Sequence, residues 1–138
     1  MPRPAPDSRD RGRPSSWSAE LDNLCGGVED RVKRLVLLSA GNVEEQDWRF
    51  YPDYNDVAQV QDPGQAWNPL TVGAFTQRFQ FDTQAYPGWR LIAQPGTLSP
   101  SSSTSVSWQS QWPNKPEIVL EGGNAARSPR NREVAPLD

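Results

Sequence analysis

The sequence predicts an α/β fold with about three parallel strands, at least one packed helix and long loops. The first observation is an apolar run at residues 35–38, Leu-Val-Leu-Leu, which does not alternate with polar residues. A strand that is apolar on both faces is typical of a parallel sheet that helices cover on each side. The second is a helical stripe of apolar residues before that run, and the third is a pair of later apolar segments, at residues 67–75 and 118–120. We therefore expect the first run to lie in the middle of the sheet.

The segment at residues 15–27 predicts a helix of about ten residues. Its apolar side chains recur at the spacing of one helical face: Trp17, Leu21, Leu24, Cys25 and Val28. Ser16 or Ser18 is expected to cap the start of this helix, and the glycines at residues 26–27 are expected to end it. We expect the apolar stripe to pack on the sheet, with Cys25 as a small core residue rather than a reactive thiol.

Both ends of the chain are rich in Arg and Pro and lack apolar periodicity. We predict that residues 1–14 and 125–138 are disordered, which leaves residues 15–124 as the folded part. The net charge of −3 and the mixing of Arg with acidic residues leave no basic face for nucleic acid. No apolar run reaches the about 18 residues that span a membrane, and the start lacks the apolar segment of a signal peptide. A single cysteine fits a reducing compartment, so a cytoplasmic localisation is favoured.

The sequence contains no histidine. A Ser-His-Asp relay and a His-ligated zinc site are therefore excluded within these 138 residues, and we expect neither a metal nor a cofactor. The predicted loop at residues 43–65 is long, aromatic and acidic, and such loops are uncommon in compact domains unless they are functional. Its carboxylates would suit calcium, which takes oxygen ligands, but they lack the alternate spacing of a known calcium loop. A solvated acidic face is the ordinary explanation, and calcium binding stays open.

Three short motifs follow one another along the chain, each on or beside an apolar segment. They read SAGN at residues 39–42, LTVGA at residues 70–74 and KPEIV at residues 115–119. In this order they resemble motifs of the subtilases, the subtilisin-like serine peptidases of family S8. The resemblance covers the predicted folded part, residues 15–124, and implies a partial subtilisin-like fold.

The resemblance also implies roles for the SAGN residues. The side chain of Asn42 would donate a hydrogen bond to the oxyanion of the tetrahedral intermediate. Ser39, Ala40 and Gly41 would form one wall of the S1 pocket, which binds the substrate side chain just before the scissile bond. In the intact family the partner is a peptide or protein substrate. The alternative for Asn42 is structural: it ends a strand in a left-handed turn, which asparagine tolerates.

Two further segments are interpreted through the resemblance. The serine-rich run at residues 98–105 could pass for a low-complexity linker, but it is expected to be an ordered loop at the rim of the active site. The segment at residues 118–120 is expected to be the third buried strand. The chain then reads LEGG at residues 120–123, where most subtilases read APG, so the backbone path there departs from the family's pattern.

The aspartate, histidine and nucleophile motifs of the family are missing. Gly96-Thr97-Leu98 begins like the nucleophile motif G-T-S, but a leucine stands at the serine position and the tripeptide precedes the third strand. We therefore expect an internal fragment of a serine endopeptidase catalytic domain, with an oxyanion donor but without a nucleophile or a base. Such a chain is predicted not to hydrolyse peptides by itself, so whether it is an enzyme stays open.

Two interpretations from other classes are kept. In the first, a small module uses its tryptophans as stacking platforms for peptides or glycans. The six tryptophans are Trp17, Trp48, Trp67, Trp89, Trp108 and Trp112. In the second, the chain complements or inhibits a full-length peptidase by pairing through the free edge of the strand at residues 35–38, an apolar edge that is also a predicted aggregation site. The sequence leaves the oligomeric state and the substrate preference open.

Overall fold

The computed structural model describes residues 11–130 and 132–137. The helices are α1 (Ser16–Gly26), the short α2 (Asp53–Val57) and the 3-10 helix η1 (Glu45–Phe50). The strands are β1 (Leu37–Ser39), β2 (Leu70–Thr76), β3 (Arg90–Leu91), β4 (Thr97–Leu98), β5 (Ile118–Glu121), β6 (Asn124–Arg127) and β7 (Val134–Leu137). Most of the predicted N-terminal tail, residues 1–10, lies outside the described residues, whereas Gly12 is buried.

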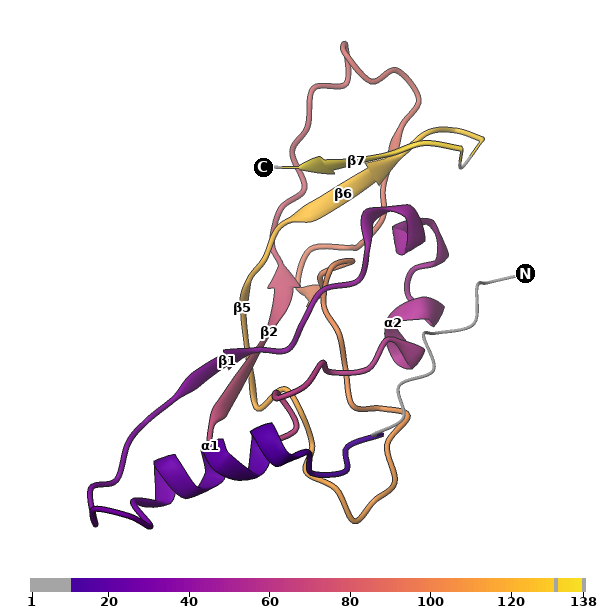
Figure 1. The fold of residues 1–138 in the computed structure, drawn as a ribbon. Helices are drawn as coiled ribbons and strands as arrows, with labels where there is room; N and C mark the ends of the chain where they lie inside the picture. Colours follow the sequence, from indigo (N-terminus) through magenta and orange to yellow (C-terminus); the bar gives the residue numbers. More distant parts are fainter. Residues whose placement is uncertain (1–10, 131, 138) are drawn as a thin grey trace.

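The centre of the fold is a four-stranded sheet in which β2 is the middle strand (Figure 1). β1 pairs with β2 in parallel, with Leu37 opposite Leu70. β5 pairs in parallel along the other side of β2, with Ile118 opposite Val72, and the short β4 is antiparallel to the end of β2. The predicted α/β class with parallel strand pairing is confirmed, but the apolar run at residues 35–38 leads into an edge strand and not into the middle of the sheet.

The outer strands are more exposed than the sequence predicts. Leu37 in β1 is 61% exposed, and Ile118, Val119 and Leu120 in β5 are all exposed. The interpretation of residues 118–120 as a buried strand is therefore wrong. The described residues supply only one helix longer than six residues, α1, so most of the apolar surface of these strands has no helix to cover it.

Local signals fix both ends of α1. Ser15 is the N-cap: its side chain accepts a hydrogen bond from the Ser18 N–H, and the Ser18 side chain accepts one from the Ser15 N–H. This reciprocal capping box places the cap at Ser15, so the prediction of Ser16 or Ser18 as the cap is wrong, although Ser18 takes part in the box. At the other end Gly27 takes the left-handed conformation with a φ of 67°, which glycine adopts without strain, so the predicted stop is confirmed.

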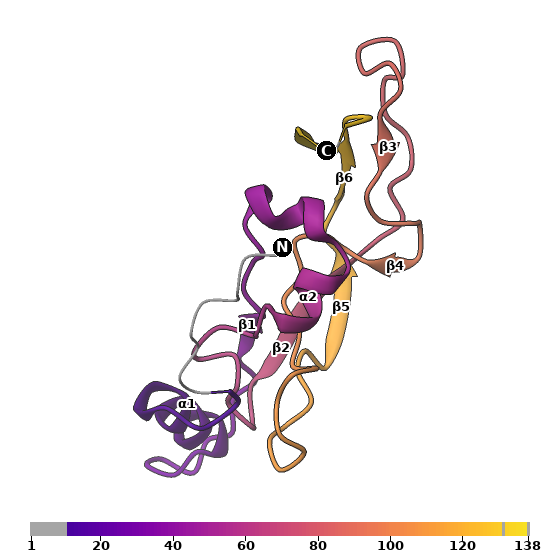
Figure 2. The same cartoon turned by 90° about the vertical axis from the view of Figure 1, so that its right-hand side faces the viewer.

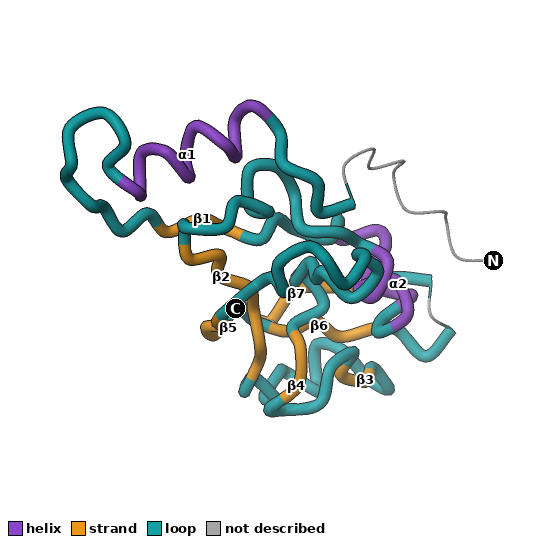
Figure 3. Tube along the Cα trace, turned by 90° about the horizontal axis from the view of Figure 1, so that it is seen from below, coloured by secondary structure: helices purple, strands orange, loops and turns teal. Residues whose placement is uncertain are grey.

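The apolar stripe of α1 is only partly covered. Cys25 is buried, as predicted for a core residue, but Trp17 is 58% exposed and Leu24 is exposed as well. The predicted packing of the whole stripe on the sheet is therefore wrong. The helix is attached instead through Asp22, whose two carboxylate oxygens accept hydrogen bonds at 2.6 and 3.2 Å from the backbone N–H groups of residues 67–68, just before β2. Figure 3 shows α1 to one side of the strands, with β1 between it and β5.

The C-terminal segment forms a second sheet. β6 lies between β3 and β7 and is antiparallel to both (Figure 2). Ala125 and Ala126, at the start of the predicted disordered tail at residues 125–138, are fully buried. The prediction of disorder is therefore wrong for the described part of this tail. β6 gains hydrogen-bonded neighbours on both sides, and one of them, β3, is distant in the sequence, so local composition does not reveal this order.

The predicted long loop at residues 43–65 contains η1 and α2. Its apolar side chains form a small cluster: Val43, Tyr54 and Ala58 are buried, and Trp48 and Phe50 pack against them. Within the part of the chain that the structure describes, no three His, Cys, Asp or Glu side chains come together as a metal site requires. None of the described helices has the length and apolar character needed to cross a membrane.

Candidate functional site

The SAGN segment begins with the last residue of β1, Ser39, and is held by three other segments. The Ala40 N–H donates to the carbonyl oxygen of Val72 in β2 at 2.9 Å, and the Ala40 carbonyl oxygen accepts from the N–H of Gln61 at 3.0 Å. Asn42 forms an isolated antiparallel bridge with Ser102. The backbone of the segment is therefore fixed by β2, by the chain after α2 and by the serine-rich loop.

Gly41 occupies a position that only glycine suits. Its φ of 95° lies in the left-handed region, and a Cβ built there would stand 2.7 Å from side-chain carbons of Gln61. The Ser39 hydroxyl oxygen accepts from the Gly41 N–H at 3.2 Å and helps to fix the turn. The glycine thus allows Gln61 to pack directly on the SAGN backbone.

The Asn42 side chain is exposed, and its carboxamide makes no hydrogen bond with any described residue. The main-chain carbonyl oxygen of Asn42 accepts from Gln61 Nε2 at 3.5 Å. The amide therefore has two N–H groups available for an oxygen atom of a ligand. A fixed backbone with an available side-chain donor is what stabilisation of an oxyanion requires.

A cavity of about 280 Å³ opens beside Asn42. Its apolar walls come from the small cluster of the 43–65 loop, and its polar wall comes from residues 59–65. Of the four SAGN residues, Asn42 lines this cavity, whereas Ser39, Ala40 and Gly41 do not. The structure therefore places Asn42 in the cavity wall and the other three residues outside that wall.

The serine-rich segment at residues 98–105 is largely buried and hydrogen-bonded. Asn55 in α2 is 1% exposed, and its Nδ2 donates to the carbonyl oxygens of Pro100 at 3.0 Å and Ser102 at 2.9 Å. The Ser102 hydroxyl oxygen accepts from the N–H of Ala74 in β2 at 2.9 Å. The loop therefore connects α2, β2 and the SAGN segment, and its place at the rim of an active site stays a prediction.

The KPEIV motif joins the entries of β2 and β5. The Lys115 side chain has no exposed surface; its Nζ donates to the carbonyl oxygen of Pro69 at 3.0 Å and forms an ion pair with Glu117. The other carboxylate oxygen of Glu117 accepts from the N–H of Thr71 at 2.8 Å. Both charged residues of the motif are thus engaged in holding the two strands together.

The tripeptide Gly96-Thr97-Leu98 does not supply a nucleophile. Thr97 and Leu98 form β4, and the Thr97 hydroxyl donates to the carbonyl oxygen of Gln94 at 2.7 Å. A serine or threonine nucleophile needs a neighbouring base. With no histidine in the sequence, the described residues contain no Ser-His-Asp arrangement.

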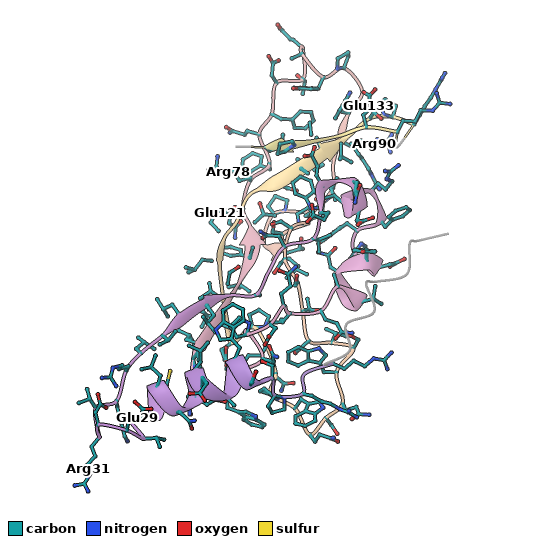
Figure 4. The ribbon with its side chains drawn as sticks, viewed as in Figure 1. Glu29, Arg31, Arg78, Arg90, Glu121 and Glu133 are labelled. Carbon is teal, nitrogen blue, oxygen red and sulfur yellow. The ribbon has the colours of Figure 1, made fainter. Side chains whose placement is uncertain are left out.

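Glu121 ends β5 with its carboxylate bonded to the backbone. It accepts from the N–H of Gln77 at 2.7 Å and from the N–H of Gly123 at 3.0 Å. The hydrogen bond from Gln77 is the main cause that lowers the pKa of Glu121 below its ordinary value, and the positive charge of Arg78 acts in the same direction. Figure 4 shows Arg78 and Glu121 near each other. The ionised carboxylate thus holds the chain where it leaves β2 and β5.

Sequence reasoning missed two residues that support the site: Gln61 packs on Gly41, and Asn55 anchors the serine-rich loop. Neither belongs to a recognisable motif. Trp108, one of the six tryptophans considered as stacking platforms, lies on the cavity wall and donates its Nε1–H to Gln59 Oε1 at 3.0 Å. The one available signal was the glycine of SAGN, because a glycine at a close approach implies a group packed on it.

The sequence matches the family model of the subtilase family, peptidase S8, over residues 5–137. The match extends beyond the predicted folded part, residues 15–124, at both ends and includes the strands of the second sheet. No curated protein and no solved structure shows a significant match. The family model covers nearly the whole chain, and the parallel pairing of β1 and β5 with β2 agrees with it. The chain therefore belongs to the subtilase family, the subtilisin-like serine peptidases.

Proposed function

We propose that this chain contributes the oxyanion donor and part of the substrate pocket of a subtilisin-like serine endopeptidase. The observation that carries the proposal is the state of Asn42: its backbone is fixed by Ser102 and Gln61, whereas its carboxamide is exposed and unengaged by the described residues. In acyl transfer such a donor acts on the carbonyl oxygen that becomes negatively charged. The cavity beside Asn42 supports the proposal, because it offers apolar room for a substrate side chain.

The other SAGN residues have a role in this proposal as a wall of the S1 pocket. Ser39, Ala40 and Gly41 carry small side chains or none. Ala40 is buried and Gln61 packs on Gly41, so a substrate peptide would reach this wall at the exposed Ser39. After the left-handed turn at Gly41, Asn42 bridges to Ser102 and not to β2, and in this proposal its exposed amide meets the substrate carbonyl. The partner is accordingly a peptide or an unfolded segment of a protein.

We also propose that these 138 residues do not hydrolyse peptides by themselves. The sequence has no histidine, so the described residues contain no Ser-His-Asp arrangement that could activate a serine. An oxyanion donor stabilises a tetrahedral intermediate only after a nucleophile has formed one. The chain therefore binds peptides without cleaving them.

The experiment is a titration of the ¹⁵N-labelled chain with an unlabelled, blocked tetrapeptide, followed by heteronuclear NMR and by chromatography of the peptide. The amide signals of residues 39–42 and the side-chain NH₂ signals of Asn42 are expected to shift, and the peptide is expected to stay intact. Asn42→Ala should weaken binding, whereas Asn114→Ala, at another exposed asparagine, should not. Cleavage of the peptide by the purified chain, or shifts confined to another surface, would overturn the proposal.

The second candidate remains a tryptophan-rich module that binds peptides or glycans. Trp17 and Trp67 favour it, because they are 58% and 54% exposed and exposed indole rings are common stacking surfaces. A change of tryptophan fluorescence on titration with oligosaccharides, lost in Trp17→Ala or Trp67→Ala, would support this module. An unchanged spectrum would exclude glycan binding by these two rings.

A further inference from the structure

One polar atom in a residue that lines the cavity beside Asn42 has no partner. Gln65 is 3% exposed, and its Oε1 is buried and accepts no hydrogen bond from the described residues. The other end of this amide is engaged, because Nε2 donates to Asp62 Oδ1 at 2.6 Å. Buried acceptors in proteins almost always have a donor. Because Gln65 lines the cavity, a hydrogen-bond donor that reaches its Oε1 would satisfy this acceptor.

Acidic side chains outnumber basic ones in the same wall. Glu44 and Asp62 line the cavity, and Arg11 is the basic residue that lines it. Asp62 Oδ1 accepts from the Ser15 hydroxyl at 2.6 Å in addition to Gln65, whereas no described residue donates to Asp62 Oδ2. The electrostatic balance of the cavity thus favours a positively charged group near Asp62.

The remaining walls are apolar and aromatic. Val43 and Tyr54 are buried and line the cavity. The Trp108 indole is held by its hydrogen bond to Gln59 and by the close approach of Gly12, where a Cβ would lie 2.7 Å from the ring. Methylene groups suit the apolar walls, and the face of an indole attracts a cation. Tyr54 belongs to α2 and Trp108 to the long loop before β5, and Figure 1 shows both segments to the right of β1, β2 and β5.

We propose that this cavity binds the side chain of an arginine or lysine in a peptide, with its positive end at Asp62 and Gln65. The idea rests on the proposed function, since it names the substrate class of the same site. Arginine and lysine combine an apolar stem with a cationic hydrogen-bond donor, which is the combination that the walls require. The volume of about 280 Å³ lies just below the range of pockets for drug-sized ligands and fits a single side chain.

The test compares blocked tetrapeptide amides that differ only in the residue offered to the cavity: arginine, lysine, norleucine or glutamate. Isothermal titration calorimetry on the 138-residue chain measures their dissociation constants. We expect arginine and lysine to bind at least about tenfold more tightly than norleucine, because norleucine fills the apolar part but leaves Asp62 and Gln65 unpaired. The side-chain NH₂ signals of Gln65 and the indole N–H signal of Trp108 should shift with the arginine peptide.

Two variants assign the selectivity to individual side chains. Asp62→Asn removes the charge and keeps an oxygen acceptor for Ser15, and Gln65→Met removes the unpaired acceptor at similar size. Each is expected to bring the affinity for arginine to within about threefold of that for norleucine. Asp53→Asn, at an exposed acidic residue of α2 outside the cavity, is the matched control and should change neither affinity. Thermal unfolding followed by tryptophan fluorescence identifies any variant that does not fold. The comparison of the four peptides on the unaltered chain tests the preference for arginine and lysine without any variant.

The outcomes separate the two proposals. Equal or tighter binding of the norleucine or glutamate peptide overturns the selectivity, and so does the absence of binding by every peptide to the folded chain. If the preference is missing while the signals of residues 39–42 still shift, only the selectivity fails. If the arginine peptide shifts Gln65 and Trp108 but not Asn42, the proposed oxyanion role fails and the cavity's preference stands.

Discussion

Lys115, with no exposed side-chain surface, donates from Nζ to the carbonyl oxygen of Pro69 at 3.0 Å. The two residues stand at the entries of β5 and β2, so one buried hydrogen bond joins two parallel strands at their starts. Glu117 balances the charge of the ammonium and is itself bonded to the backbone of β2. Lysine is almost never fully buried unless it is paired in this way.

Lys115→Met is expected to destabilise the chain by about 1–3 kcal/mol, the cost of leaving a buried acceptor such as the Pro69 carbonyl oxygen without its donor. Urea unfolding followed by tryptophan fluorescence measures the change. Lys33→Met, at an exposed lysine, is the control and should stay within about 0.5 kcal/mol of the unaltered chain. Equal effects of the two substitutions would contradict the structural role of the buried ammonium.

Gly41→Ala is expected to destabilise the SAGN turn by about 1–3 kcal/mol, because alanine is strained at positive φ and its Cβ would meet the Gln61 side chain. Gly26→Ala is the matched substitution inside α1, where the added methyl group meets only an ordinary contact. It should stabilise the chain by about 0.4–1 kcal/mol. Opposite signs in thermal or urea unfolding support the geometry, and stabilisation by Gly41→Ala would contradict it.

Asn55→Ala is expected to loosen the serine-rich loop and to cost about 1–3 kcal/mol, since the carbonyl oxygens of Pro100 and Ser102 lose their buried donor. Hydrogen exchange gives a local readout: the amide of Thr104, which donates to the carbonyl oxygen of Ala58 at 3.0 Å, should exchange faster. Asn114→Ala, at an exposed asparagine, is the control. Unchanged protection of Thr104 in Asn55→Ala would argue against this anchoring.

The hydrogen bonds from the Arg34 side chain, with a smaller contribution from the Val32 N–H, lower the pKa of Asp30 from its ordinary 3.8 to about 2. A carboxyl group with a lower pKa in the folded state contributes stability above its unfolded pKa, and that contribution is lost as the pH falls through the folded value. The contribution of Asp30 should therefore be complete above about pH 4 and disappear towards about pH 2. NMR titration of the Asp30 carboxyl carbon measures this directly, and Arg34→Gln should move the pKa back towards 3.8. A titration near 3.8 in the unaltered chain would show that the pair does not form in solution.

The elements that local chemistry specifies were predictable. The helix at residues 16–26 follows from its apolar spacing and its terminal glycines, and β2 and β5 follow from apolar runs. Burial was not predictable from the same runs, because it depends on whether another element covers them, and Leu37 remains 61% exposed. The order of β6 was missed for a similar reason: Ala126, which is buried, pairs with Leu91 in β3, a strand that lies far away in the sequence.

The residues of the candidate site also fall into those that a motif revealed and those that only the structure revealed. Asn42 and Gly41 were found because they belong to a short motif of small residues with one amide. The residues that fix them, Gln61 and Asn55, lie in the 43–65 loop and carry no pattern of their own. Their importance arises from contacts between segments, and a sequence records such contacts only where they force an unusual residue, as at Gly41.

Asp22 has a consequence for the helix that carries it. Two oxygens of one carboxylate bind two consecutive backbone N–H groups, so the attachment is directional and sets how α1 is aligned with β2. Apolar packing alone would allow the helix to roll about its axis. The two hydrogen bonds to Asp22 therefore restrict the rotation of α1 about its axis, and Trp17 and Leu24 are held exposed while Cys25 of the same stripe is buried.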